Sequence, residues 1–229
     1  IGRETIMDYN LTDQQQAELI KNWLKENAKF LSAVLILGLS GFFGGQYYRE
    51  NNLKQAEMAS KLFSEMEYSV KLKRISQAQS LLQQIDNDFA NTPYQDQGHL
   101  LMSKLFIDAT EYDNAIIQLE FLLDNSDEES LQHISRLRIA RIKLQQNLLD
   151  EALTTLQIES MGTFEAKYEE IKGDIYSEKG DLLQAGESYR RALDLMLPGN
   201  FDYDFIEIKL KDIQNKEILG AVDTEEDTA

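Results

Sequence analysis

The amino-acid sequence predicts an all-α protein with one transmembrane helix near the N-terminus, followed by a solenoid of helical hairpins. Three observations lead to this fold class. Residues 30–48 contain no formal charge, although the 229-residue chain has a net charge of −17. The chain contains two prolines, which leaves few positions for the turns of a β-structure. Small residues recur at intervals of 37, 37 and 33 positions further along the chain, as in a repeat protein.

The uncharged run reads FLSAVLILGLSGFFGGQYY and lies between Lys29 and Arg49. At about 1.5 Å per helical residue, its length approaches the roughly 30 Å of a bilayer's hydrocarbon core. A cleaved signal peptide would have a short basic segment before the run and small residues at a cleavage site after it. The sequence instead has a polar stretch with several acidic residues before the run, and Gln-Tyr-Tyr at its end. A buried core helix is the other alternative, but such helices are usually shorter. We therefore predict an uncleaved membrane anchor.

The anchor contains small residues four positions apart on adjacent helical rows: Ser40 with Gly44, and Gly41 with Gly45. Pairs of this kind let a second membrane helix approach closely. Glycine is also simply tolerated in membrane helices, and the sequence leaves both interpretations open. A packing role for these four residues is therefore a hypothesis.

The segment before the anchor is predicted to form an interfacial helix. Residues 17–30 place Leu19, Ile20, Trp23 and Leu24 on one helical face. Basic residues are equally frequent within a similar distance on the two sides of the anchor. The positive-inside rule therefore does not decide which end of the chain faces the cytoplasm.

The clearest repeat is GDIYSEKGDLLQAGESYRRAL, at residues 173–193. Its spacing is that of a tetratricopeptide helix–turn–helix unit. In this interpretation Gly173 and Ala185 lie where the two helices cross, and Gly180 ends the first helix in the left-handed conformation. The structural positions of the repeat are Gly173, Tyr176, Gly180, Ala185, Tyr189 and Ala192.

The same frame returns upstream at steps of 33, 37 and 37 residues. Asn147 takes the place of Gly180, and Asn tolerates the left-handed conformation better than most residues. Two positions that are usually apolar are Glu169 and Lys172, so the match of the last repeat is partial. An irregular helical bundle is the alternative. We predict four tetratricopeptide-like repeats and a capping helix near residues 202–219.

The first helix of each repeat lines the concave surface of a tetratricopeptide solenoid. The predicted groove residues are Leu100, Lys104, Ile107, Leu137, Arg141 and Leu144. They form two stripes at i, i+4 and i+7 that each read apolar–basic–apolar, and the next stripe is acidic, with Glu170, Asp174 and Ser177. We predict a groove with apolar patches and buried cations, which suits a segment carrying apolar side chains and carboxylates. The alternative is that the apolar residues only pack helix against helix.

The residue patterns do not predict catalysis, a metal site or a cofactor. His99 and His133 have no second ligand at metal-binding spacing, and the chain contains no cysteine. The sequence also lacks the glycine spacing of a phosphate loop and the G-x-S-x-G motif of a nucleophile elbow. Its acidic surplus argues against nucleic acid, because phosphate contacts need clusters of Lys and Arg. We expect a protein that is not an enzyme and has no nucleic-acid partner.

The anchor and repeats together resemble the YfgM family, the ancillary subunits of the bacterial SecYEG translocon. The resemblance is carried by NWLKENAKFLSAVLILGLSGFFGGQYYRENN at the anchor, and by LRIARIKLQQNLLDEALTTLQ and IKGDIYSEKGDLLQAGESYRRAL in the repeats. It implies a single-pass protein of the bacterial inner membrane, with a cytoplasmic N-terminus and a periplasmic repeat domain. The partners that it implies are the SecYEG translocon, the membrane-anchored chaperone PpiD, exported client proteins and periplasmic chaperones. The acidic extension after Leu219 departs from the family pattern.

The expected domains are an N-terminal cytoplasmic segment (1–29), the transmembrane helix (30–48), the tetratricopeptide-like domain (49–219) and a disordered acidic tail (220–229). The expected function is that of a membrane-anchored interaction module that assists the passage of exported proteins to periplasmic chaperones. The alternative is a membrane-anchored tetratricopeptide scaffold for envelope or cell-division assembly.

Overall fold

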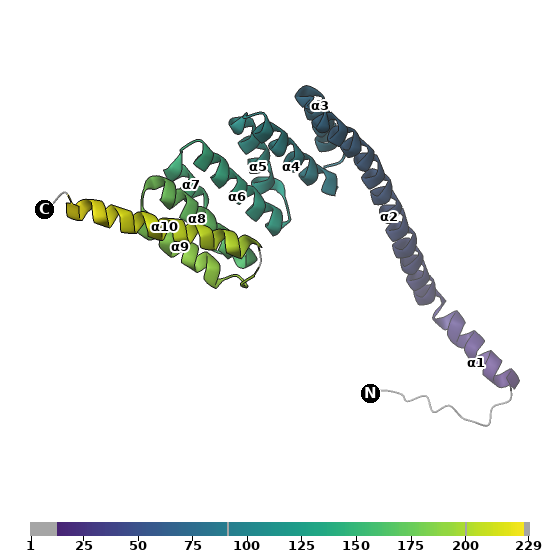
Figure 1. Cartoon of the computed structure of the whole chain (residues 1–229). Coiled ribbons are helices and arrows are strands. Elements are labelled where there is room, and N and C mark those ends of the chain that lie inside the picture. Colours follow the sequence, from purple (N-terminus) through teal and green to yellow (C-terminus); the bar gives the residue numbers. More distant parts are fainter. Residues whose placement is uncertain (1–12, 91, 200, 227–229) are drawn as a thin grey trace. The chain divides into compact units, whose positions relative to one another are not determined.

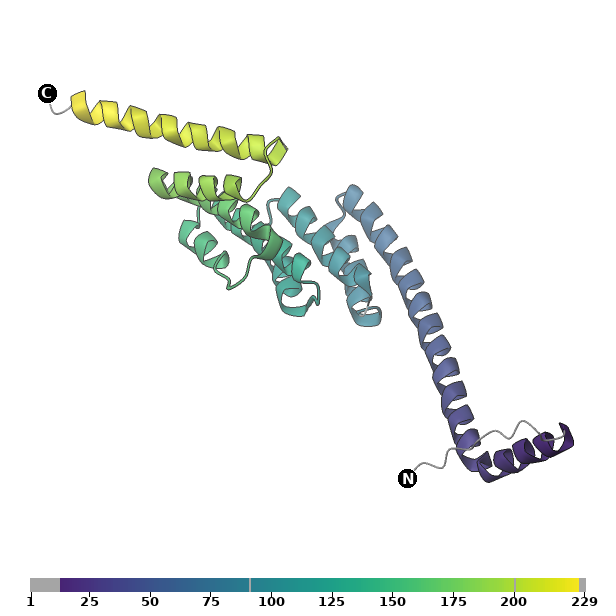
Figure 2. The ribbon, with the colours of Figure 1, turned by 90° about the horizontal axis from the view of Figure 1, so that it is seen from below.

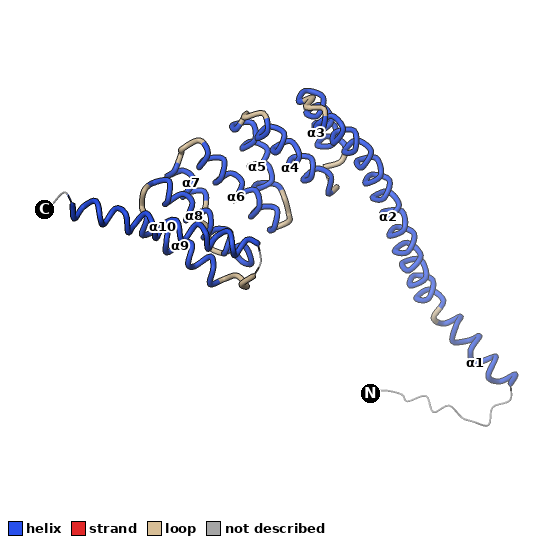
Figure 3. Tube along the Cα trace, viewed as in Figure 1, coloured by secondary structure: helices blue, strands red, loops and turns tan. Residues whose placement is uncertain are grey.

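The computed structural model describes residues 13–90, 92–199 and 201–226, and every regular element in these ranges is a helix (Figure 3). The all-α prediction is therefore confirmed. The chain divides into two compact units, Ile1–Met58 and Ala59–Ala229, which are described separately below.

The first unit contains α1 (Asp13–Glu26) and most of α2 (Ala28–Lys71). Among the described residues, α2 is the one helix that is long and apolar enough to cross a membrane. Its most apolar 18-residue window has a mean hydropathy of 1.6, and none of that window is buried. The helix continues beyond the predicted anchor to Lys71, so the backbone does not leave the helical conformation where a signal peptide would be cut.

The second unit contains four helical hairpins within the described residues, followed by α10 (Phe201–Glu226) (Figure 1). The hairpins are the end of α2 with α3 (Ile75–Asp88), α4 (Pro93–Asp108) with α5 (Tyr112–Asn125), α6 (Glu129–Gln145) with α7 (Leu149–Thr155), and α8 (Glu165–Lys179) with α9 (Leu182–Asp194). A 3-10 turn, η1 (Gly162–Phe164), precedes α8. The predicted solenoid of hairpins is thus confirmed.

Each hairpin turns through a residue in the left-handed conformation. Lys73, Thr110 and Asn147 are the described non-glycine residues with positive φ, at 55°, 60° and 60°, and Gly180 has a φ of 78°. These four positions are separated by 37, 37 and 33 residues, which is the repeat length in the sequence. The same turn geometry therefore recurs in every hairpin.

The two helices of each hairpin cross at small residues. Ala78, Ala115, Ala152 and Ala185 stand in equivalent places on the second helices, and all four are fully buried. In the last hairpin the facing residue is Gly173, where an added Cβ would lie 2.5 Å from the Cε1 atom of the Tyr189 ring. A larger side chain there would collide with the tyrosine, so α8 and α9 can approach closely only with glycine at this position.

The described core residues form three clusters along the second unit. The third cluster joins α9 to α10 through Tyr189, Ile206 and Ile213. The two isoleucines are seven residues apart on α10 and therefore lie on one face of that helix. The predicted capping helix is therefore present and packs on the last hairpin. Helix α10 continues to Glu226, so residues 220–226 of the predicted disordered tail are helical. Residues 1–12 of the predicted N-terminal segment and residues 227–229 of the predicted tail lie outside the described residues.

Candidate partner-binding site

The predicted groove residues lie on α4 and α6, the first helices of two successive hairpins. Leu100 and Ile107 are half-buried against the first core cluster, and Leu144 is half-buried against the second. Leu137 belongs to the second cluster, and 7% of its surface is exposed. These four side chains thus contribute to packing, and three of them also present part of their surface to solvent.

The two cations of the predicted groove, Lys104 and Arg141, are exposed. The Arg141 side chain is 52% accessible, and its Nη2 atom lies 3.9 Å from Oε1 of Glu170 on α8. The expectation that these cations are buried is therefore wrong. Long basic side chains keep their stems on the protein and their charged ends in water, which explains the difference. The face offers two accessible cations beside partly buried apolar side chains.

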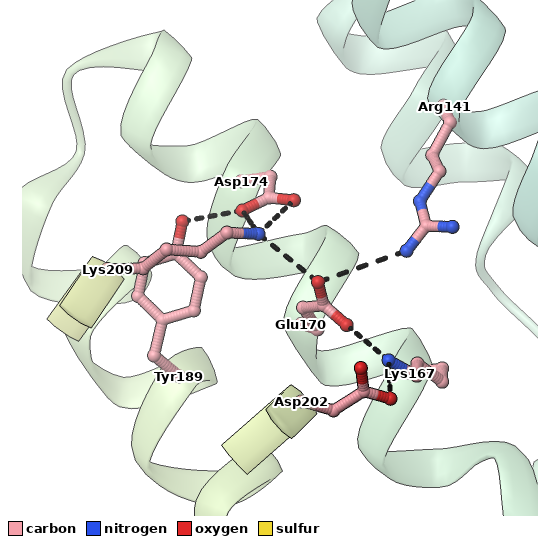
Figure 4. Close-up of polar contacts among 7 residues, drawn as sticks. All are labelled: Arg141, Lys167, Glu170, Asp174, Tyr189, Asp202 and Lys209. Carbon is pink, nitrogen blue, oxygen red and sulfur yellow. Dashed lines mark hydrogen bonds and ion pairs between the residues drawn. The ribbon is translucent and has the colours of Figure 1, made fainter. Parts of the chain in front are cut away.

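The acidic stripe on α8 is neutralised from within the chain (Figure 4). Glu170 is 5% exposed, and its carboxylate accepts hydrogen bonds from Lys167 at 3.0 Å and from Lys209 of α10 at 3.2 Å. Lys167 also forms an ion pair with Asp202 at 2.8 Å. A buried carboxylate is tolerated only when it is paired, and here α10 supplies one of the partners.

Asp174 lies one turn further along α8 and shares the same lysine. Lys209 Nζ donates to both carboxylate oxygens of Asp174, at 2.7 and 2.9 Å, and the Tyr189 hydroxyl donates to Oδ1 at 2.7 Å (Figure 4). The Lys209 ammonium also lies 4.7 Å from the centroid of the Phe205 ring. The cation is therefore held by two carboxylates and an aromatic face.

The network shifts the titration of its members. Burial alone would raise the pKa of the Glu170 carboxyl, but the ammonium groups of Lys167 and Lys209 outweigh burial and hold this pKa below its ordinary value. Burial raises the pKa of the Tyr189 hydroxyl well above its ordinary range, and the neighbouring Asp174 carboxylate raises it further. Near neutral pH the site therefore contains ionised Glu170 and neutral Tyr189.

A hollow of about 540 Å³ lies beside this network. Its walls include Leu144 of α6, Asp174 and Ser177 of α8, Tyr189 of α9, and Lys209 and Ile213 of α10. Of the predicted groove residues, Leu144 is the one that lines it. Arg141 reaches the network through Glu170, while Leu100, Lys104 and Ile107 lie on α4. The structure therefore brings the second predicted stripe and the acidic stripe together.

Sequence reasoning missed Lys209, which lies between two apolar residues of the predicted capping helix. A lysine in such a helix does not by its type indicate whom it pairs with. The signal that was present is the acidic stripe itself, because Glu170 and Asp174 lie one turn apart on a helix predicted to line the groove, and two neighbouring carboxylates favour a cation nearby.

The two histidines are buried and have neighbours that account for their positions. The ring nitrogens of His99 lie 2.9 Å from Gln118 Oε1 and 3.1 Å from Asp86 Oδ1. His133 Nδ1 lies 3.0 Å from the Tyr168 hydroxyl oxygen. Within the described part of the chain, His, Asp and Glu side chains do not form a group of three that could hold a metal ion.

The small residues of the anchor, Ser40, Gly41, Gly44 and Gly45, all lie on α2 and are exposed. A Cβ added at any of these three glycines would have no described atom within 4 Å other than those of its chain neighbours and of the backbone of α2. This surface is open to a neighbouring membrane helix, and its packing role stays a prediction.

The family model of the tetratricopeptide repeat-like domain matches residues 21–215. Among similar curated proteins, the ancillary SecYEG translocon subunit of Haemophilus influenzae is 28% identical over 81% of this chain and 91% of its own length. The subunit of the same name from Aggregatibacter actinomycetemcomitans is 25% identical over 90% of this chain and all of its own length. The one from Escherichia coli is 26% identical over 76% of this chain and 84% of its own length. No solved structure matches the chain.

The family model begins before the anchor and ends within α10, so it includes both features on which the sequence resemblance rests. The relatives likewise share most of their length with this chain. The chain therefore belongs to the tetratricopeptide repeat-like domain family, and its resemblance to the YfgM family is confirmed.

Proposed function

We propose that this protein is an ancillary subunit of the SecYEG translocon in the bacterial inner membrane. The observation that carries the proposal is the extent of the match to relatives of that name, which covers 76–90% of this chain for the E. coli and A. actinomycetemcomitans proteins. An unrelated tetratricopeptide protein would share the repeats without the anchor. The family model here spans both.

The proposed topology has the N-terminal segment in the cytoplasm and the repeat domain in the periplasm. The unbroken course of α2 from Ala28 to Lys71 supports an uncleaved anchor. Alkaline phosphatase fused after Leu219 should be active, because this enzyme requires the periplasm. Green fluorescent protein fused at the same place should stay dark, because it does not become fluorescent when it is exported unfolded to the periplasm. The reverse pair of results would contradict the topology.

The repeat domain acts in this proposal by binding rather than by catalysis. Its proposed partners are PpiD and segments of exported client proteins. The client proteins are then passed to periplasmic chaperones. The exposed ends of Lys104 and Arg141, next to the half-buried Leu100, Ile107 and Leu144, support a partner segment with carboxylates and apolar side chains.

Co-purification of the detergent-solubilised full chain tests the proposed partners. The chain should bring down the SecYEG core together with PpiD. Recovery of a division or envelope-assembly complex without the translocon would overturn the proposal and favour the scaffold function.

A change of charge tests the proposed face. Lys104→Glu with Arg141→Gln should reduce recovery of PpiD and of client segments. The thermal unfolding midpoint should stay nearly unchanged, because both cations are exposed and Glu170 keeps Lys167 and Lys209 as partners. Lys211→Glu is the matched control, since Lys211 is an exposed cation on α10 that pairs with Glu207 at 3.3 Å. Equal recovery with both variants would place the partner surface elsewhere.

A further inference from the structure

Helix α1 has an apolar face that no described part of the chain covers. Leu19, Ile20, Trp23 and Leu24 are all exposed, and α1 has no buried residue. On a helix these four residues occupy one continuous face, because positions i, i+1, i+4 and i+5 lie close together around the axis. A contiguous exposed apolar face of this kind marks a surface that binds something.

Basic side chains lie on the other side of the helix, beyond Leu24. Lys21 and Lys25 are one turn apart, and they line a hollow of about 500 Å³ together with Ile20 and Leu24. Lys29 follows one turn later, at the start of α2. The helix thus has an apolar face and ammonium groups on its polar side, which complements a molecule that has acyl chains and a phosphate.

The position of α1 in the chain indicates where that molecule is found. Asn27 is the single residue between α1 and α2, and its side-chain amide donates to the Trp23 carbonyl at 2.8 Å. Figure 2 shows that α1 leaves the direction of α2 at this point. Trp23 precedes the first residue of the anchor by seven positions, roughly 10 Å of helix. When the anchor occupies a bilayer, the C-terminal end of α1 therefore lies at the level of the lipid headgroups.

We propose that α1 is a lipid-binding helix that lies in the membrane interface where the anchor begins. Its apolar face is buried at the boundary of the acyl chains, and Lys21, Lys25 and Lys29 bind the phosphates of anionic lipids. This inference rests on the proposed membrane anchoring and adds a second, surface-bound element to it. Lipid is favoured over a protein partner because an apolar face with lysines on the polar side is the arrangement of a helix that lies in a membrane interface.

Trp23 allows a direct test, because it is the only tryptophan in the chain. The full chain is reconstituted without any translocon component into nanodiscs of phosphatidylcholine and phosphatidylglycerol. Trp23 emission should be blue-shifted, and lipids brominated close to the headgroup should quench it more strongly than lipids brominated near the chain ends. Unquenched emission would overturn the proposal and favour a protein partner, and stronger deep quenching would show that α1 is part of the span.

Two aspartate substitutions test the assigned face. Ile20→Asp places a charge on the apolar face and should abolish quenching by the brominated lipids. Asn22→Asp introduces the same charge two residues away, on the polar side of α1, and should reduce the quenching much less. Equal effects of the two variants would contradict the orientation.

The lysines are tested by omitting the anionic lipid. Removing phosphatidylglycerol should lower the ratio of bound to free α1 on the order of tenfold, because each surface lysine contributes to binding. Lys21→Gln with Lys25→Gln should remove most of this lipid dependence, and a variant that keeps it would refute the role of these lysines. A chain that fails to enter nanodiscs at all would instead refute the anchoring proposal, so the two failures are distinguishable.

Discussion

Replacing Lys209 by Met tests whether the charged network of α8 and α10 stabilises the repeat domain. Met keeps most of the apolar stem of the side chain and removes the ammonium group. The loss leaves Glu170 with Lys167 as its nearest cation and leaves Asp174 with the Tyr189 hydroxyl as its donor. The substitution therefore weakens two paired carboxylates at once without opening a large cavity.

The expected loss of stability follows from these contacts. A hydrogen bond to a charged group contributes about 1.5–3 kcal/mol, and removing one partner of a buried ion pair costs about 3–5 kcal/mol. Solvent screening is limited, since the Lys209 and Glu170 side chains are 21% and 6% accessible. Because both carboxylates keep another partner, we expect the free energy of unfolding to fall by about 2–3 kcal/mol at neutral pH.

The effect should also depend on pH, with a sign set by Glu170. Its pKa in the folded protein lies below the ordinary value of 4.5. The charged carboxylate therefore contributes stability that is present above this ordinary pKa and is lost as the pH falls through the folded pKa. Lys209 interacts favourably only with the charged form. The difference in the free energy of unfolding between the Lys209→Met variant and the wild type should accordingly become smaller as the pH falls below 4.5.

Urea unfolding of the full chain in mild detergent, followed by circular dichroism, measures this difference. Lys211→Met is the matched control, because Lys211 lies two residues away, is 63% accessible and pairs with Glu207 on the same helix. Such an exposed pair contributes about 0.3–0.5 kcal/mol. The reasoning is refuted if the two variants lose equal stability at neutral pH. It is also refuted if the stability that Lys209→Met loses relative to the wild type is the same at low pH.

Three further variants test the hairpin crossing, a turn and the anchor. Gly173→Ala should lower the free energy of unfolding by about 1–3 kcal/mol, because the new Cβ would lie 2.5 Å from the Tyr189 ring; unchanged urea unfolding would show that the ring moves freely. Thr110→Gly should raise it by up to about 1 kcal/mol, since a β-branched residue at a φ of 60° is strained; a lower unfolding midpoint would contradict this. Gly41→Leu with Gly45→Leu should reduce translocon co-purification if the anchor packs on another membrane helix, and unchanged recovery would leave the anchor as a tether.

The sequence predicted best those positions where backbone geometry restricts the residue type. Asn147 and Gly180 stand where φ is positive, a conformation that few residue types adopt readily. The buried alanines of the second helices stand where two backbones approach closely. Lys73 shares the left-handed turn, yet lysine has no preference for it, so this member of the repeat could not be identified from its residue type.

Charged residues were harder to place, because their type does not reveal whether they are buried. Glu169 and Lys172 occupy positions that are usually apolar, so the sequence match of the last repeat is partial. In the structure Lys172 donates to Glu169 at 2.7 Å, and Glu169 is buried. An ion pair along α8 thus takes the place of apolar contacts. Sequence periodicity shows only that an apolar residue is missing at a position. Which side chain pairs with the charged residue there depends on how the helices pack.

The charge pattern along the first helices separates the contacts that stabilise the fold from those available to a partner. On α8 the acidic side chains Glu170 and Asp174 accept hydrogen bonds from Lys209 of the same chain. On α4 and α6 the cations Lys104 and Arg141 keep their charged ends in solvent. A partner with carboxylates should therefore bind at α4 and α6, so the Lys104→Glu and Arg141→Gln changes should affect binding and leave stability nearly intact. Lys209→Met should do the opposite. If Lys209→Met instead reduced binding at unchanged stability, the hollow beside α10 would be the partner site.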